Sequence, residues 1–92
     1  MKYFDWDESK NEWLKEERGI GFEDVVAALD KGKELDRIDH PNKRRYPNQR
    51  EIIVNIENYA YIIPFVEDEG KVFLKTIIPS RKATKKYLGG NK

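Results

Sequence analysis

Apolar segments separated by turn residues occupy the middle of the sequence, and they limit the possible folds more than any other feature. The segments cover residues 52–56, 60–66 and 72–78, and in the first of them aliphatic residues occupy every second position. A period of two is typical of a strand with one buried face. Asn58 and the stretch 68–70, Asp-Glu-Gly, are turn residues between the segments. We therefore predict an antiparallel meander of three to four strands.

Pro64 lies inside the second predicted strand. Proline has no backbone N–H to donate, so this strand is predicted to be an edge at that point or to carry a bulge there. Apolar residues such as Ile53, Ile62 and Phe73 leave both faces of the meander partly apolar. We expect helices to cover one face, and a partner chain or the first strand to shield part of the other.

A short strand and two helices are predicted before the meander. The aromatic stretch 3–6 predicts the strand. The first helix then begins after Asp7, a good N-cap, and ends at Gly19, with Trp13 and Leu14 as a narrow apolar stripe.

The second helix is predicted from Gly21 to Gly32 and supplies the main core face. Its apolar residues have the i, i+3, i+4, i+7 spacing of a buried helix face: Phe22, Val25, Val26 and Leu29. A short edge strand at 35–38 and a long exposed loop at 40–50 should follow, the loop being either functional or merely flexible.

The chain should close with a short basic helix over 80–88, started by Ser80 and ended by Gly89-Gly90. With 92 residues, the chain has the length of one small domain, 1–92. The predicted fold class is α+β: a short N-terminal strand, two helices, an antiparallel meander and a short C-terminal basic helix.

Composition excludes several classes of function. The chain has no cysteine and one histidine, so neither a disulfide nor a metal site is expected, and no cofactor is predicted. No apolar run approaches the roughly 20 residues of a membrane span, and the N-terminus lacks the pattern of a signal peptide. We expect a cytoplasmic protein with no membrane partner.

The net charge of +1 hides two basic segments. Residues 40–50 carry four bases and no acid, and residues 80–92 carry five bases and no acid. Arginine binds phosphate oxygens through a planar fork, and an aromatic ring such as Tyr46 or Tyr87 can stack on an RNA base. We expect the fold to place these two basic segments against each other. The candidate RNA-binding residues are Lys43, Arg44, Arg45, Tyr46, Lys82 and Lys85, with Arg50 and Arg81 as phosphate ligands. The alternative is that these charges are solvated and only keep the protein soluble.

His40 precedes the basic residues of the loop, and histidine is the residue type most often used for proton transfer at neutral pH. Cleavage of an RNA backbone needs a base for the 2′-hydroxyl, an acid for the leaving oxygen and cations on the phosphate. His40 is therefore the candidate for proton transfer. The alternative is that His-Pro only opens a turn.

Several motifs, taken in order along the chain, resemble the BrnT toxins of bacterial type II toxin–antitoxin systems. They are Phe4-Asp5-Trp6-Asp7 with Lys10-Asn11, then Gly19 to Glu23, and finally Ile77-Ile78-Pro79-Ser80-Arg81-Lys82-Ala83-Thr84. The closing motif is the most specific. The resemblance implies a RelE-like α+β fold and a metal-independent ribonuclease that stops growth by cutting RNA. It also implies a ribbon-helix-helix antitoxin from the same operon, with operator DNA bound only through that antitoxin.

Carried over by motif, Arg81 and Lys82 occupy the arginine and lysine of the closing motif, and Arg50 is the basic residue before the meander. The sequence departs from the family at Glu17-Arg18, where the family has Lys-His, and at Thr76 and Pro79. Lys75 lies one place from the missing basic residue and so on the other strand face.

Three hypotheses remain open. The first is a toxin that cleaves RNA with Arg81, Arg50 and His40 as catalytic residues. The second is a non-catalytic module that docks an antitoxin or a nucleic acid through its sheet and basic face. The third is a protein whose charges serve solubility alone.

Overall fold

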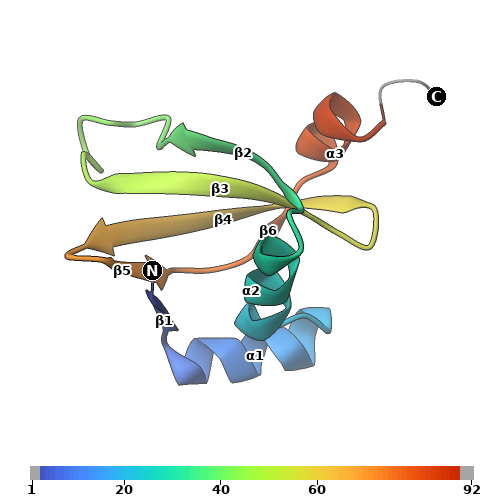
Figure 1. Cartoon of the computed structure of the whole chain (residues 1–92), viewed down its shortest axis with the longest axis horizontal. Helices are drawn as coiled ribbons and strands as arrows, with labels where there is room; N and C mark the ends of the chain where they lie inside the picture. The colour runs from blue at the N-terminus through green and yellow to red at the C-terminus, as the bar shows by residue number, and fades with distance from the viewer. Residues whose placement is uncertain (1–2, 90–92) are drawn as a thin grey trace.

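A twisted sheet separates two helices on one side from a third helix on the other (Figure 1). The computed structural model describes residues 3–89, so Gly90 and the first residues of the N-terminus lie outside the described part. The elements in order are β1 (Tyr3–Trp6), α1 (Glu8–Arg18), α2 (Phe22–Asp30), β2 (Glu34–Asp39), β3 (Gln49–Ile56), β4 (Tyr59–Asp68), β5 (Lys71–Leu74), β6 (Ile78–Pro79) and α3 (Arg81–Tyr87).

The predicted antiparallel meander is confirmed in β3, β4 and β5, and the strand order is β1-β5-β4-β3-β2. Asn58 and Gly70 lie in the two turns with φ of 65° and 83°, as their residue types indicate. β2 is an edge strand, as predicted. β1 pairs parallel with β5, which makes the sheet mixed. The expectation that the first strand shields a sheet face is wrong, because β1 extends the sheet at its edge.

Pro64 explains a break in the last predicted strand, which the structure divides into β5 and β6. The backbone N–H of Lys75 donates to the carbonyl of Pro64 over 2.8 Å. In a strand, the N–H and C=O of one residue point to the same neighbour, so the N–H that proline lacks would also have pointed toward the segment of Lys75. Between the pairs Phe65–Leu74 and Ile62–Ile78, two residues of β4 face three residues of the other chain segment. The extra residue therefore lies on the segment that faces Pro64, between β5 and β6, and not on β4, where the bulge alternative placed it.

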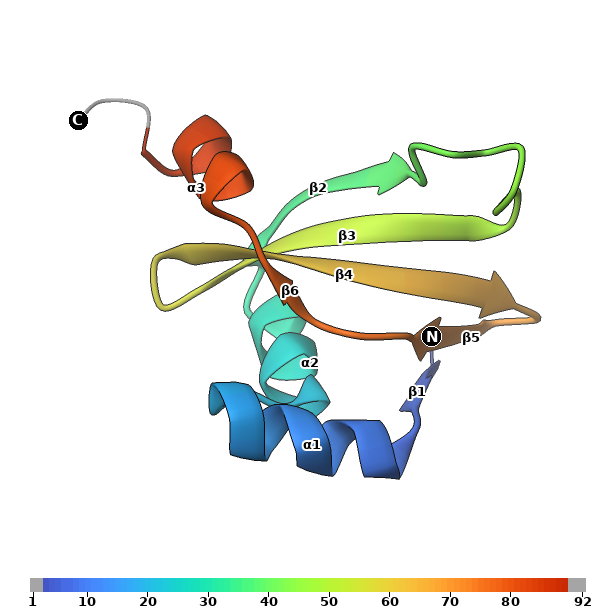
Figure 2. The ribbon, with the colours of Figure 1, turned by 180° about the vertical axis from the view of Figure 1, so that it is seen from behind.

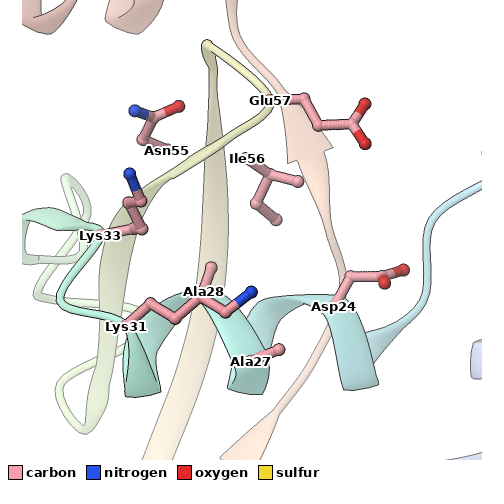
Figure 3. A pocket seen from close by; sticks show the side chains of 8 residues that line it. All are labelled: Asp24, Ala27, Ala28, Lys31, Lys33, Asn55, Ile56 and Glu57. Carbon is pink, nitrogen blue, oxygen red and sulfur yellow. The ribbon is translucent and has the colours of Figure 1, made fainter.

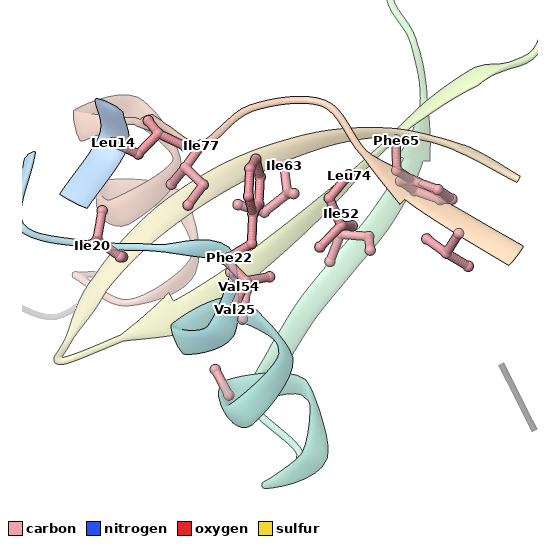
Figure 4. Packing of buried hydrophobic residues seen from close by; sticks show 12 residues of the cluster. Leu14, Ile20, Phe22, Val25, Ile52, Val54, Ile63, Phe65, Leu74 and Ile77 are labelled. Carbon is pink, nitrogen blue, oxygen red and sulfur yellow. The ribbon is translucent and has the colours of Figure 1, made fainter. Parts of the chain in front are cut away.

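The main core lies between the sheet and the pair α1 and α2 (Figure 4). Leu14, Phe22 and Val25 from the helices pack against buried sheet residues that include Ile52, Ile63 and Leu74. We call this side of the sheet the helical face. Of the predicted apolar stripe of α1, Leu14 is buried, whereas Trp13 is 45% exposed, with the cations of Lys10 and Arg18 at 5.0 and 5.6 Å from its ring centroid. The polar residue Asn11 is buried as well.

The opposite side of the sheet, which we call the α3 face, is only partly covered (Figure 2). Ala83 of α3 is buried against Ile53 and Ala60, and Ile62 and Tyr87 pack around them. Tyr3, Ile38, Phe73 and Ile78 on this face remain between 37% and 67% exposed, because no element of the described chain lies over them.

Candidate functional site

The loop between β2 and β3, residues 40–48, is exposed, as predicted, and is organised by its own hydrogen bonds. We call it the basic loop; Arg50, predicted in the loop, instead belongs to β3. Asn42 accepts from the Arg45 N–H at 3.2 Å through its side chain and from the Tyr46 N–H at 3.0 Å through its carbonyl. Asparagine is suited to such turns because its amide can replace a backbone partner. The loop therefore has a defined local fold.

Aromatic and cationic groups stack within the basic loop. The rings of His40 and Tyr46 have centroids 4.5 Å apart, and the guanidinium carbon of Arg45 lies 5.7 Å from the Tyr46 centroid. The Tyr46 side of this stack reaches solvent, with 38% of the residue exposed. A partly exposed ring next to a second ring and a guanidinium offers a surface on which a single-stranded base can stack.

The ring of His40 has a fixed tautomer when neutral. Its Nδ1 accepts a hydrogen bond from the Asn42 N–H at 2.9 Å, so the proton of the neutral ring resides on Nε2. Protonation of Nδ1 would break this bond. His40 therefore orders the turn through Nδ1, and while that bond holds its Nε2 carries a proton that it can donate.

Arg50 lies on the helical face at the loop end of β3. Its guanidinium carbon is 6.0 Å from the ring centroid of Phe65, which is its partner across the β3–β4 pair. Its Nε lies 3.3 Å from the carboxylate of Asp39 but out of line for a hydrogen bond, so this buried nitrogen donates to no described residue. Lys43 reaches the same carboxylate at 3.1 Å. The hydrogen bond and charge of Lys43, with a smaller contribution from Arg50, hold the pKa of Asp39 below its ordinary value.

The structure adds Arg37, a residue that the sequence interpretation did not select. Its guanidinium carbon lies 5.4 Å from the Phe65 centroid, so two arginines contact one ring. Arg37 also donates to both carboxylate oxygens of Glu34, at 2.8 and 2.9 Å, and this raises its pKa. The sequence alone offered little reason to select Arg37, because it does not show how β2 and β3 pair. Only the observed register of that pair places Arg37 on the same sheet face as Arg50.

α3 carries the second basic segment and is fixed to the sheet at both ends. Ser80 caps it by accepting from the Ala83 N–H at 3.0 Å, as predicted, and Thr84 Oγ1 accepts from the Ala60 N–H at 2.9 Å. At the other end the Tyr87 hydroxyl donates to Asp36 at 2.7 Å. Within residues 3–89, the side chains of Arg81, Lys82 and Lys85 have no ion-pair partner and are exposed.

The two basic segments do not form one site. The basic loop and α3 lie at opposite ends of the longest axis of the molecule (Figures 1 and 2). In addition, Arg50 contacts Phe65 on the helical face, whereas Ala83 packs α3 onto the other face. The expectation that the fold places one basic segment against the other is wrong, because α3 packs where small and aliphatic residues start β4.

The positions that depart from the family resemblance lie around the broken strand. Thr76 is between β5 and β6, and the Lys75 ammonium lies 5.8 Å from the Phe73 ring centroid. Arg18 donates to the carbonyl of Ile77 and so ties the end of α1 to this break. Here Arg18 has a structural role.

A pocket of about 230 Å³ lies between α2 and the β3–β4 turn, away from both basic segments (Figure 3). Lys31 and Lys33 line it together with Asp24 and Glu57, and none of the predicted site residues does. Among residues 3–89, no three acidic, histidine or cysteine side chains are grouped so as to hold a metal ion. In the same residues, no helix is long and apolar enough to cross a membrane.

Comparison of the chain with protein-family models, with curated proteins and with solved structures found no match. Function is therefore inferred from the residues and their geometry.

Proposed function

We propose that this protein is the toxin of a type II toxin–antitoxin pair, with a RelE-like fold and metal-independent endoribonuclease activity. Its partners are RNA, a ribbon-helix-helix antitoxin and, through that antitoxin alone, operator DNA. The observation that carries the proposal is the basic loop, in which His40, Tyr46 and Arg45 stack close to Lys43 and Arg44 in the sequence. The order of the family-like motifs along the chain supports it further.

In the proposed reaction the basic loop holds a single-stranded segment. A base stacks on Tyr46, and Arg44 and Arg45 neutralise the phosphate, since arginine keeps its charge at any physiological pH. The 2′-hydroxyl gives its proton to water as its oxygen attacks phosphorus. The P–O5′ bond breaks, and His40 in its protonated form donates the proton of Nε2 to the leaving 5′-oxygen, so no metal is needed for the balance of the step.

The arginines predicted as catalytic take different parts in this proposal. Arg50 lies on β3 next to the basic loop, and its remaining N–H groups add positive charge beside the Lys43–Asp39 ion pair. Arg81 begins α3 at the far end of the molecule, so it contacts another phosphate of the same strand with Lys82 and Lys85.

Degradation of a single-stranded RNA by purified protein in EDTA tests the proposal. Wild type should cleave, and His40→Ala should lower the rate by roughly 100-fold or more, the usual effect of losing a general acid or base. Arg81→Ala should weaken RNA binding more than it changes the rate of the bound complex. Lys31→Ala, at the remote pocket, is the matched control and should cleave like wild type.

Two results decide against the proposed chemistry. Cleavage that continues unchanged in His40→Ala would remove this residue from the mechanism. No cleavage by wild type in any of the RNAs, with RNA still bound, would support the second candidate, a non-catalytic binding module. The observation that favours this candidate is the incompletely covered α3 face of the sheet. A neighbouring reading frame for a small ribbon-helix-helix protein is expected under both.

A further inference from the structure

An apolar groove of about 180 Å³ lies between α3 and the open part of the sheet. Ile38, Ile53 and Ile62 form its floor from three adjacent strands, and Ala83 and Tyr87 form its wall on α3. Lys82 and Lys86 line the same groove from α3. We call this feature the α3 groove; it is separate from the basic loop.

The α3 groove is held open by fixed elements. The Thr84–Ala60 and Tyr87–Asp36 hydrogen bonds anchor α3 to β4 and β2, so the wall cannot move onto the floor without breaking them. Ile38 nevertheless remains 37% exposed. A preformed apolar groove binds a partner without the cost of first opening it.

The floor favours a protein segment over a nucleic acid. Single-stranded RNA is bound by exposed aromatic faces and polar groups that read base edges. The floor offers branched aliphatic side chains, and the hydroxyl of Tyr87 is already engaged with Asp36. Aliphatic or aromatic side chains of a peptide fill such a surface.

The charges select the kind of segment. Lys82 and Lys86 are four residues apart on α3, so they lie on one side of the helix about 6 Å from each other. Acidic side chains one helical turn apart on a partner would match this spacing. The partner must therefore combine an apolar stripe with a border of carboxylates.

The outer helix of a second copy of this chain does not fit this description. The exposed large apolar residue of α1 is Trp13, and the cations of Lys10 and Arg18 lie 5.0 and 5.6 Å from its ring centroid. Docking it in the α3 groove would set these cations against Lys82 and Lys86. Like charges across an interface disfavour the wrong partner.

We propose that the α3 groove binds an acidic amphipathic helix of a partner protein, whose apolar stripe covers the exposed parts of Ile38 and Ile62 and whose carboxylates pair with Lys82 and Lys86. The proposal rests on the partner half of the proposed function and is independent of RNA cleavage. The exposed Ile78 and Phe73 extend the same face, so a longer segment can continue over β6 and β5.

The test measures binding of a labelled synthetic helix by fluorescence anisotropy. The probe has about 15 residues, the length at which a peptide helix becomes marginally stable, with leucines at i, i+3, i+4 and i+7 and glutamates along both borders. Wild type should bind it, and Lys82→Glu with Lys86→Glu should lower the affinity by about tenfold or more. Lys31→Glu with Lys33→Glu carries the same charge change far from the groove and should alter the affinity by no more than about twofold.

Two further arms make the result specific. A probe with lysines in place of glutamates should bind the Lys82→Glu, Lys86→Glu variant better than wild type. Ile38→Ser, a change at a half-exposed floor residue, should weaken the acidic probe without lowering the melting temperature substantially. His40→Ala should bind the probe like wild type, which separates this proposal from the nuclease proposal.

Several results would overturn the proposal. They are no binding of the acidic probe to wild type, equal losses in both double variants, or displacement of the probe by oligouridylate whose own binding falls in Ile38→Ser. The last would assign the α3 groove to RNA. A wild-type dimer that becomes monomeric in Lys82→Glu with Lys86→Glu would assign it to a second copy of the chain.

Discussion

Asn11 joins the first two helices through a fully buried polar side chain. Its Oδ1 accepts from the Phe22 N–H at 2.7 Å, and its Nδ2 donates to the carboxylate of Glu23 at 3.0 Å. The first N–H groups of a helix have no partner within that helix. Asn11 therefore supplies the partner for the start of α2 and also lowers the pKa of Glu23.

Asn11→Ala should destabilise the protein by about 2 kcal/mol or more, because it leaves the buried Phe22 N–H without an acceptor. Urea denaturation at neutral pH measures this loss. Glu12→Ala, an exposed change on the next residue of α1, is the control and should stay within about 0.5 kcal/mol. Equal stability of Asn11→Ala and Glu12→Ala would show that another group satisfies the start of α2.

The Tyr87–Asp36 hydrogen bond predicts a pH dependence at a second residue pair. It lowers the pKa of Asp36 and raises the pKa of Tyr87. A depressed carboxyl pKa stabilises the fold above the unfolded value of about 3.9, and this contribution is lost as pH falls through the folded pKa. A raised tyrosine pKa stabilises below the unfolded value of about 10 and loses its effect as pH rises through the folded pKa.

Tyr87→Phe should therefore lower the melting temperature most between about pH 5 and 9, and the difference from wild type should shrink in acid below about pH 3.9 and in alkali above about pH 10. Melting curves across this pH range measure it. Tyr59→Phe, whose hydroxyl makes no hydrogen bond within residues 3–89, is the control. A constant difference for Tyr87→Phe at every pH would contradict a charge-assisted bond.

At the level of elements, the junction between α1 and α2 depends on two glycines for different reasons. Gly19 ends α1 in the left-handed region with φ of 69°, and its N–H donates to Lys15. A Cβ there would meet no atom within 4 Å, so only the backbone conformation requires glycine. Gly21 has an ordinary φ of −121°, but a Cβ would lie 2.7 Å from Lys15 and 2.9 Å from Asn11 Oδ1.

Gly19→Ala should cost about 1 kcal/mol, the usual penalty for a side chain in this region, and Gly19→Asn less. Gly21→Ala should cost more than Gly19→Ala, because Asn11 is fixed by its bond to Phe22 and cannot give way freely. Equilibrium denaturation of the three variants gives the order. The opposite order would mean that the side chains around Gly21 move at little cost.

At the level of the whole molecule, the two basic segments should act as separate electrostatic contacts. They lie at opposite ends of the long axis, and the loop segment is partly neutralised by the carboxylate of Asp39. Sites this far apart with no shared partner usually contribute additively. A strand of RNA that contacts both would release counterions at each.

The double variants Arg44→Ala with Arg45→Ala, and Lys82→Ala with Lys85→Ala, should each reduce the salt dependence of RNA affinity by about two units of slope. Their combination should show the sum of both effects. Titration of a single-stranded RNA over a range of KCl concentrations measures the slopes, with Lys31→Ala and Lys33→Ala as the matched control. A flat salt response in wild type would contradict a phosphate-binding role for either segment.

Much of the architecture was predictable from the sequence, because helix caps, helix ends and turns are encoded by residues close together in the chain. Asp7 and Ser80 cap their helices within three residues, Gly19 ends α1, and the turns at Asn58 and Gly70 lie where the apolar alternation stops. Such signals act between neighbours in the chain. They place elements correctly, but they do not say which distant segments meet.

Sequence by itself determined the α+β composition, the edge position of β2, the meander and the basic character of two segments, because periodicity and capping are local. Only the tertiary structure decided that β1 pairs parallel with β5, that Asp39 partly neutralises the loop and that the basic segments lie apart. Those results depend on strand register and on which face α3 can cover. α3 packs through Ala83 against Ala60 and Ile53, at the opposite end of the long axis from the basic loop, so the two basic segments do not form one continuous site.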